Sequence, residues 1–168
     1  PLNITGLAYG LYSKDFIKES STVVTRYEYN PFYAGLGATG YIVNAKLQYR
    51  VDGIYQGGDA YNLTSNGESI QNKIMAAALI SRVNYALPVL RTVDPQLNAE
   101  YTMASGDGDA ARAGTASQSN TAGNYTAFQS FGAYSGGLAL KPRLTNIQIF
   151  RGGVELRPLK MFYWARNI

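Results

Sequence analysis

The 168-residue sequence contains no cysteine and no histidine, and these two absences remove most of the familiar enzyme chemistry. Without cysteine there is no disulfide, no thiol nucleophile and no zinc site built on thiolates. Without histidine there is no Ser-His-Asp triad and no imidazole acid–base catalysis. We therefore expect a protein that is not an enzyme and that needs no cofactor.

Charged residues and long apolar runs are also scarce. Only 15% of the residues are charged, against about 25% in soluble domains. The net charge is +4, but the basic residues are scattered singly, so we expect no nucleic-acid partner. The longest uninterrupted apolar stretch covers residues 74–80, whereas a membrane-spanning helix needs about 20 residues. If a membrane is involved, helices do not cross it.

The dominant pattern in the sequence is a period of two, which is typical of β-strands with two different faces. In residues 46–56 and 96–105, apolar and polar side chains alternate almost without exception. One face of these strands is apolar, and we expect it to contact lipid: Leu47, Tyr49, Val51, Tyr55, Leu97, Tyr101 and Met103. The other face is polar, and we expect it to face the interior: Gln48, Arg50, Asp52, Asn98 and Glu100.

Other segments show the same period less clearly. Residues 73–88 alternate, although their Ala, Met and Leu content leaves a helix as the alternative. The apolar phase changes near Pro31 within residues 25–43, and Gly152-Gly153 interrupts residues 143–157, so both places predict a β-bulge. With further strands at residues 7–11 and 160–166, the sequence predicts seven or eight strands.

The predicted connections alternate between short and long. Short ones lie at Asn44-Ala45, 90–95 and 157–159, and long polar ones at 14–24, 57–72 and 106–137. Bacterial outer-membrane barrels have short periplasmic turns and long extracellular loops, whereas a loop of about 30 residues is uncommon in a compact soluble domain. We therefore expect one all-β domain over residues 1–168, an antiparallel transmembrane β-barrel or a contiguous segment of one. Residues 106–137 form a long, partly mobile extracellular loop in this interpretation.

The composition of the faces also favours a barrel over a soluble sandwich. A sandwich core is mostly Val, Ile, Leu and Phe, whereas these apolar faces are rich in Tyr, Gly and Ala. Several tyrosines near strand ends suit the aromatic girdles of a barrel: Tyr27, Tyr29, Tyr49, Tyr55, Tyr85, Tyr101 and Tyr163. Half-buried tyrosines of an ordinary sheet are the alternative. The charges in mid-strand need water or partners, which either a polar lumen or a solvated sheet face would supply.

Three stretches together resemble the alginate-export family of Gram-negative outer-membrane barrels. They are YRVDGIYQGGD at residues 49–59, KIMAAAL at residues 73–79 and YTMASGD at residues 101–107. In that family a strand tends to end in Gly-Asp, an Ala-rich strand follows, and the next outgoing strand ends in Ala-Ser-Gly-Asp before a long extracellular loop. The chain departs from the family in its length and in ending without a terminal aromatic residue. A segment of a larger barrel would show both departures.

The resemblance implies an outer-membrane channel or porin that passes an anionic polysaccharide or small hydrophilic solutes. Its partners would be outer-membrane lipid, the solute and further chain segments that complete the barrel. We expect six basic residues to face the lumen and to set anion preference: Lys46, Arg50, Arg82, Arg151, Arg157 and Arg166. The alternative function is a soluble or surface-attached all-β module that binds carbohydrate, or acts as an adhesin, through its tyrosine-rich face.

Two groups of acidic residues are candidates for chemical sites. Asp107 and Asp109 lie among glycines as in a calcium loop, but the further acidic ligands of such a loop are missing, and a turn capped by Asp side chains is the alternative. Four other carboxylates could in principle form a glycosidase pair: Glu28, Asp52, Glu100 and Glu155. No spacing selects two of them, so we expect no catalytic residue and no metal site.

Overall fold

The computed structural model describes residues 3–14, 28–42, 44, 46–63, 69–88, 94–108, 124–131 and 144–156. This part of the chain contains six strands and no helix. The strands are β1 (Asn3–Tyr12), β2 (Glu28–Ile42), β3 (Leu47–Leu63), β4 (Ser69–Ala86), β5 (Gln96–Ala104) and β6 (Ile147–Glu155). The all-β prediction is confirmed, and the helical alternative for residues 73–88 is wrong because β4 runs through that segment.

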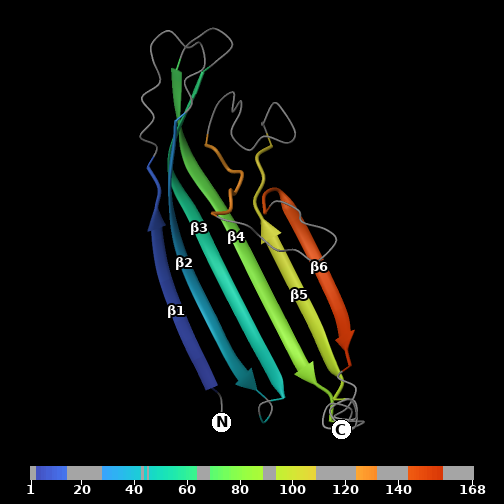
Figure 1. The fold of residues 1–168 in the computed structure, drawn as a ribbon. Helices are drawn as coiled ribbons and strands as arrows, with labels where there is room; N and C mark the ends of the chain where they lie inside the picture. The colour runs from blue at the N-terminus through green and yellow to red at the C-terminus, as the bar shows by residue number, and fades with distance from the viewer. Residues whose placement is uncertain are drawn as a thin grey trace, which may run out of the picture.

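The six strands form one antiparallel sheet in which each strand pairs with its neighbour in sequence. Figure 1 shows this order from β1 at one edge to β6 at the other. Within the described residues, β1 and β6 are open edges, so the sheet is not closed. Its central strands are long, since β3 has 17 residues and β4 has 18, whereas strands of globular proteins usually have about 5–6.

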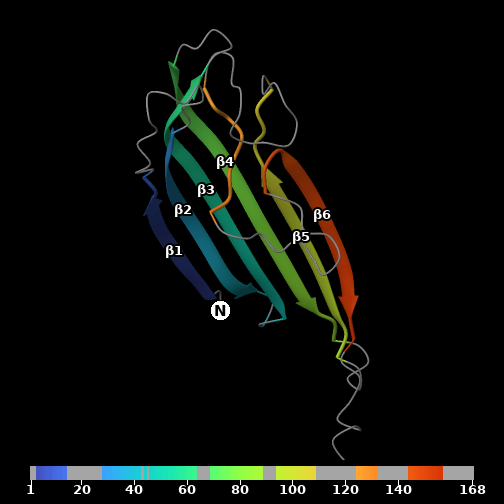
Figure 2. The same ribbon diagram turned by 45° about the horizontal axis from the view of Figure 1, so that its top comes forward.

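The register separates the side chains into two faces. We call the face on which residues 124–131 lie the inner face, and the opposite one the outer face (Figures 1 and 2). Leu47 lies opposite Tyr85, and Gln48 lies opposite Asn84, and successive side chains of a strand point to opposite faces. The apolar and polar sets predicted from the alternation therefore lie on opposite faces of the sheet, the polar set on the inner one.

Neither predicted bulge is present. The pairing of β2 with β3 runs without interruption from Glu28 to Ile42, with Pro31 opposite Gly58. Gly58 has a φ of 125°, and a Cβ there would collide with the Asn30 carbonyl oxygen, so only glycine suits the position. The apparent phase change has another cause: Tyr29 faces inward, so the apolar residues move from one face to the other while the pairing stays in register.

The second predicted bulge is wrong for a simpler reason. Gly152 pairs with Ala99 and Gly153 pairs with Asn98, in step with the rest of β5 and β6. A Cβ at Gly153 would have no atom within 4 Å. The two glycines therefore interrupt the side-chain pattern without disturbing the strand.

The strand connections only partly match the expectation. A tight turn at Asn44, whose φ is 53°, joins β2 to β3 as predicted, because Asn tolerates the left-handed conformation. The predicted long loop at residues 57–72 is wrong, since β3 extends to Leu63 and β4 begins at Ser69. Polar residues at both ends of the predicted loop are strand residues, and one of them, Asn72, is buried.

Several predicted features lie outside the described residues. They are the strand at residues 160–166, the connection at 157–159, most of the connection at 14–24, and Tyr27 and Tyr163. The predicted loop at residues 106–137 is described only over residues 106–108 and 124–131.

Residues 124–131, which we call the inner segment, cross the inner face of the sheet (the orange stretch in Figures 1 and 2). Phe128 is 1% exposed and packs with Tyr33, Ala76, Ala78, Ala104 and Leu144. The Phe128 and Tyr33 rings meet edge to face with centroids 6.2 Å apart. The core of the described structure therefore lies between the inner segment and the sheet.

The tyrosines divide between the two faces. Tyr29 packs edge to face on Tyr125 of the inner segment, at 5.9 Å, so its assignment to a lipid-facing girdle is wrong. Its partner in register is Ala60, an inner-face residue that is 1% exposed. By contrast, the register places four of the predicted girdle tyrosines on the outer face: Tyr49, Tyr55, Tyr85 and Tyr101.

Candidate functional site

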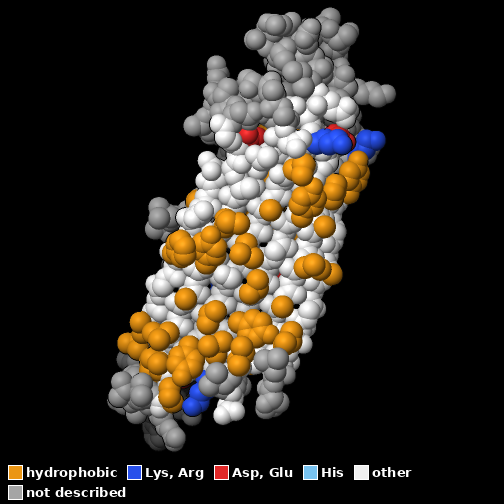
Figure 3. Space-filling view, turned by 180° about the vertical axis from the view of Figure 1, so that it is seen from behind, with side chains coloured by type: hydrophobic (Ala, Val, Ile, Leu, Met, Phe, Trp, Pro, Cys, Tyr) orange, Lys and Arg blue, Asp and Glu red, His pale blue; other side chains and the backbone are white. Residues whose placement is uncertain are grey.

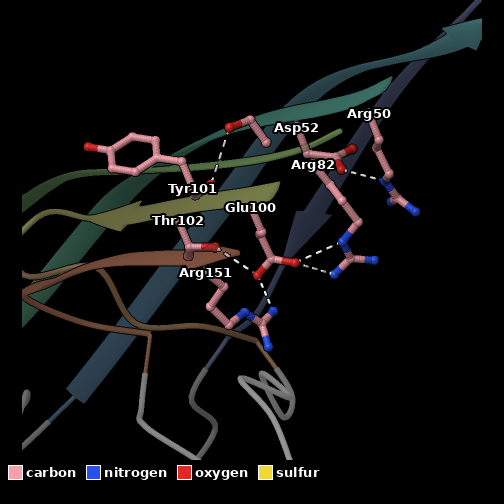
Figure 4. A network of polar contacts seen from close by, with 8 residues as sticks. Arg50, Asp52, Arg82, Glu100, Tyr101, Thr102 and Arg151 are labelled. Carbon is pink, nitrogen blue, oxygen red and sulfur yellow. Dashed lines mark hydrogen bonds and ion pairs between the residues drawn. The ribbon is translucent and has the colours of Figure 1, made fainter. Parts of the chain in front are cut away.

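Four charged residues from four different strands form a row across the inner face. Arg50 of β3 lies opposite Arg82 of β4, Arg82 lies opposite Glu100 of β5, and Glu100 lies opposite Arg151 of β6. Because residues opposite one another point to the same face, their side chains gather at one level (Figure 4). We call these four residues the arginine row. It brings together three of the six basic residues predicted to face the lumen.

Glu100 is the buried centre of the row. Its side chain is only 7% exposed, and an Arg82 Nη2 lies 2.5 Å from Oε2. The Arg82 Nε donates to the same oxygen at 2.8 Å, and Arg151 Nη2 donates to Oε1. The Thr102 hydroxyl also donates to Oε1, at 3.4 Å. This buried carboxylate therefore has the partners that compensate its loss of water.

A second ion pair lies at the other end of the row. Arg50 Nε donates to Asp52 Oδ2 at 2.6 Å within β3. The Asp52 side chain is 12% exposed, and it occupies the space above Gly37, where a Cβ would lie 2.5 Å from Oδ1. Glycine at this place on β2 thus gives the carboxylate room to meet Arg50.

The row leaves positive charge accessible. The Arg50 and Arg82 side chains are 60% and 51% exposed, and each guanidinium has five N–H donors, more than its ion pair uses. Like charges directly opposite one another on neighbouring strands are unfavourable. An anion held between Arg50 and Arg82 would relieve that repulsion, so the arrangement suits binding of carboxylate or another oxyanion.

A hollow of about 450 Å³ adjoins the row. Arg82, Glu100 and Arg151 line it together with two amide side chains, Asn84 and Asn98. Arginines and amides side by side supply donors for a hydrated or oxygen-rich solute. The hollow is therefore a polar surface next to accessible positive charge.

The inner segment is fixed to the sheet by backbone hydrogen bonds. Tyr125 N–H donates to the Lys73 carbonyl at 2.8 Å, and Met75 N–H donates to the Tyr125 carbonyl at 2.9 Å. Phe128 N–H donates to the Ser105 carbonyl at 3.0 Å. The segment thus adds a short strand-like contact beside β4, which the sequence alone did not indicate.

Side chains of the sheet complete the attachment. Gln56, 0% exposed, accepts a hydrogen bond from Gln129 N–H through Oε1 at 2.8 Å. The Tyr33 hydroxyl donates to the Gln129 carbonyl at 2.9 Å. Burial raises the pKa of Tyr125, and its hydroxyl accepts a hydrogen bond from Gln129 Nε2 at 3.0 Å. The segment is therefore held at both its backbone and its side chains.

Asp107, one of the two residues considered for a calcium site, has a structural role instead. Asp107 Oδ2 accepts a hydrogen bond from Thr126 N–H at 3.0 Å, so it positions the start of the inner segment. Asp109 lies outside the described residues. Among the described residues, no three His, Cys, Asp or Glu side chains gather as they would around a metal ion. In the same part of the chain, no helix is long and apolar enough to cross a membrane.

The other predicted site residues lie apart from the row or cannot be placed. Lys46 is exposed and precedes β3, several residues from Arg50. Arg157 and Arg166 lie outside the described residues. Two of the four carboxylates named as candidates for a glycosidase pair, Asp52 and Glu100, form ion pairs with arginines.

The buried carboxylate at the centre of the row should contribute to stability. Replacing Glu100 by Gln removes the charge that faces Arg82 and Arg151. Breaking a fully buried ion pair costs about 3–5 kcal/mol, and the partial exposure of both arginines reduces the expected loss to about 1–2 kcal/mol. Urea unfolding of the chain in detergent measures it. Asp94→Asn, at an exposed carboxylate just before β5, is the control, and equal losses in the two variants would contradict the role given to Glu100.

Comparison with known proteins gives one match. A family model described as alginate export matches residues 6–164. No curated protein and no solved structure matches the chain. The matched region includes all six strands except the first residues of β1, as well as the inner segment and the arginine row. The chain therefore belongs to the alginate export family.

Proposed function

We propose that the chain forms part of an outer-membrane β-barrel channel that passes anionic, hydrophilic solutes along its inner face. Membership of a family described as alginate export supports transport of a polysaccharide and a place in the bacterial outer membrane. The observation that carries the proposal is the contrast between the two faces of one sheet. The outer face is apolar over most of its length, whereas the inner face holds the arginine row.

The outer face has the composition that lipid requires. From Met75 to Tyr85, the outward side chains of β4 are all uncharged, and large apolar residues are open to the surroundings, such as Leu36 at 72% and Phe150 at 78% exposure. Figure 3 shows this face, with hydrophobic side chains along it and charged ones near its two ends. A soluble monomer rarely leaves so large an apolar surface uncovered.

The length of the uncharged stretch also suits a bilayer. Ten residue steps separate Met75 from Tyr85, which at about 3.3 Å a residue is about 33 Å along the strand. Strands of membrane barrels tilt by about 40°, so this length corresponds to a band about 25 Å high, the usual apolar height of such barrels. Asp59 and Lys73, which lie opposite one another, mark one end of the band on the outer face.

The two edge strands of the sheet, β1 and β6, show what a closed barrel would still need. Among the residues that the structure describes, none pairs with the outer side of β1 or of β6, and unpaired edges are not tolerated within lipid. Closure of the barrel therefore requires strands beside β1 and β6 in addition to the six that the structure describes.

Cysteine labelling tests the orientation of the two faces, because the natural chain has no cysteine. Leu97→Cys and Asn98→Cys place a thiol at adjacent positions of β5 that point to opposite faces. With the protein in lipid vesicles, a membrane-impermeant maleimide should label Asn98→Cys through the aqueous pore and spare Leu97→Cys. The pair Val51→Cys and Gln48→Cys provides the same comparison on β3. Equal labelling of both positions would favour the soluble carbohydrate-binding module instead.

A further inference from the structure

A second hollow on the inner face differs in chemistry from the one beside the arginine row. It measures about 440 Å³ and lies between β1–β4 and the inner segment, within the size range of small-molecule sites. Its walls are mainly hydrocarbon: Leu11, Tyr33, Ile54, Ile80, Phe128 and Leu144. We call it the apolar cavity. Hydrophilic solutes would account for the arginine row, but they would not account for an apolar cavity inside the same channel.

Three side chains that line the cavity carry hydroxyl groups: Tyr9, Tyr33 and Ser130. The Tyr33 hydroxyl already donates to the Gln129 carbonyl at 2.9 Å and accepts from Gln56 Nε2 at 3.1 Å. Ile54, Ile80 and Leu144 supply no hydrogen-bonding group at all. Each sugar hydroxyl placed against them would lose its water without a replacement partner, at a cost of about 1–3 kcal/mol. The cavity therefore suits an apolar body and disfavours a pyranose ring.

The cavity ends next to positive charge. Ile80, in its wall, is two residues from Arg82 on the same face of β4, a spacing of about 6.6 Å. Asp52, the ion-pair partner of Arg50, lies opposite Ile80 in register, so Arg50 and its carboxylate partner also lie near this end of the cavity. Both arginines keep at least half of their side-chain surface exposed. A molecule with its body in the cavity could therefore place an anionic group at Arg50 and Arg82.

We propose that the apolar cavity and the arginine row together bind an organic anion with an apolar body, such as an aromatic carboxylate. The ring occupies the space among Ile54, Ile80 and Phe128, and the carboxylate meets the free guanidinium donors of Arg50 and Arg82. This inference rests on the proposed function, because the solute reaches the site through the pore. It adds a solute class that is distinct from a polysaccharide.

Binding of 1-naphthoate to the purified chain in lipid nanodiscs tests the proposal by isothermal titration calorimetry. We expect saturable binding of 1-naphthoate and much weaker binding of glucuronate, which has the carboxylate but a polar body. Ile80→Gln should weaken 1-naphthoate binding at least about tenfold, because it places an amide in the cavity wall. Arg82→Gln should weaken it by a similar factor.

The matched control is Ile149→Gln. Ile149 lies in the same register row as Ile80, since both pair with Thr102, but it does not line the cavity. This variant should bind 1-naphthoate as the natural chain does. If Ile80→Gln does not fold, Leu11→Gln tests the same wall from the edge strand β1, where Leu11 is 37% exposed.

Three results would overturn the proposal: no saturable 1-naphthoate binding by the natural chain, equal affinity of the natural chain for glucuronate, or unchanged affinity in the folded cavity variant. Measuring conductance in planar bilayers distinguishes failure of the cavity site from failure of the proposed channel function. Anion conductance without 1-naphthoate binding rejects only the cavity site. Binding without any conductance rejects the channel and leaves the cavity as a site of a binding protein.

Discussion

Replacing Arg50 and Arg82 together by Gln should reverse the ion preference of the reconstituted channel from anions to cations. The arginine row and Asp52 together carry three positive and two negative charges, and the double variant leaves one positive charge with the two negative ones. Low-dielectric walls strengthen the field of such charges relative to open water. The reversal potential in a salt gradient across a planar bilayer measures the preference, and its sign should change.

The control for this experiment is Lys73→Gln, which removes a positive charge from the outer face at the end of the apolar band. That variant should leave the reversal potential unchanged. The sheet of the double variant should still form, because Glu100 keeps its contact with Arg151 and Gln keeps much of the arginine side-chain length. A folded double variant with the natural selectivity would show that these arginines serve only to pair with carboxylates.

Replacing Phe128 by Ala should increase single-channel conductance severalfold by releasing the inner segment from the inner face. Phe128 is the most deeply buried large side chain of the segment, at 1% exposure. Truncating a buried Phe to Ala costs about 3–5 kcal/mol, which is large compared with the few net hydrogen bonds that hold the rest of the segment. Single-channel recordings in planar bilayers measure the effect.

Phe131→Ala is the matched control, because Phe131 belongs to the same segment but is 68% exposed. This control should conduct as the natural chain does. Identical conductance of the natural chain and Phe128→Ala would mean that the inner segment does not narrow the path, or that its hydrogen bonds to Ser105 and Gln56 are enough to keep it in place.

The assignment of residues to the two faces could be read from the sequence because it depends only on local geometry. Side chains of a strand alternate between faces, so Leu97 and Asn98 were correctly separated without knowledge of any partner strand. The prediction of a loop at residues 57–72 came from composition instead, and it was wrong. Glycines and polar residues such as Asn72 are typical of loops, but composition does not distinguish a polar strand from a polar loop.

The arginine row could not be predicted from local strand geometry alone. The Arg50–Asp52 pair is visible in the sequence, since the two residues are two apart on one strand face. The contact of Arg82 with Glu100 and that of Glu100 with Arg151 depend on the register of three strands, and the latter pair is separated by 51 residues. Register follows from how whole faces pair, which a single sequence does not specify.

The inner segment was the least predictable feature. Its attachment is entirely non-local, as Gln129 bonds Gln56 and Tyr33, which lie 73 and 96 residues away. The only sequence signal was the presence of Phe128 and Phe131 in a stretch otherwise rich in small and polar residues. A large aromatic residue there needs a place to be buried, and the inner face of the sheet provides it.

The arginine row has one consequence for the path of a solute through the proposed channel. The row runs perpendicular to the strands, so in a barrel with strands tilted by about 40° it is inclined to the membrane plane by the same angle. Across the three strand gaps from β3 to β6, each about 4.8 Å, the row would climb about 9 Å. Its guanidinium groups then lie at successive depths of the pore. An anion would move from one arginine to the next, and would not have to leave one strong binding site in a single step.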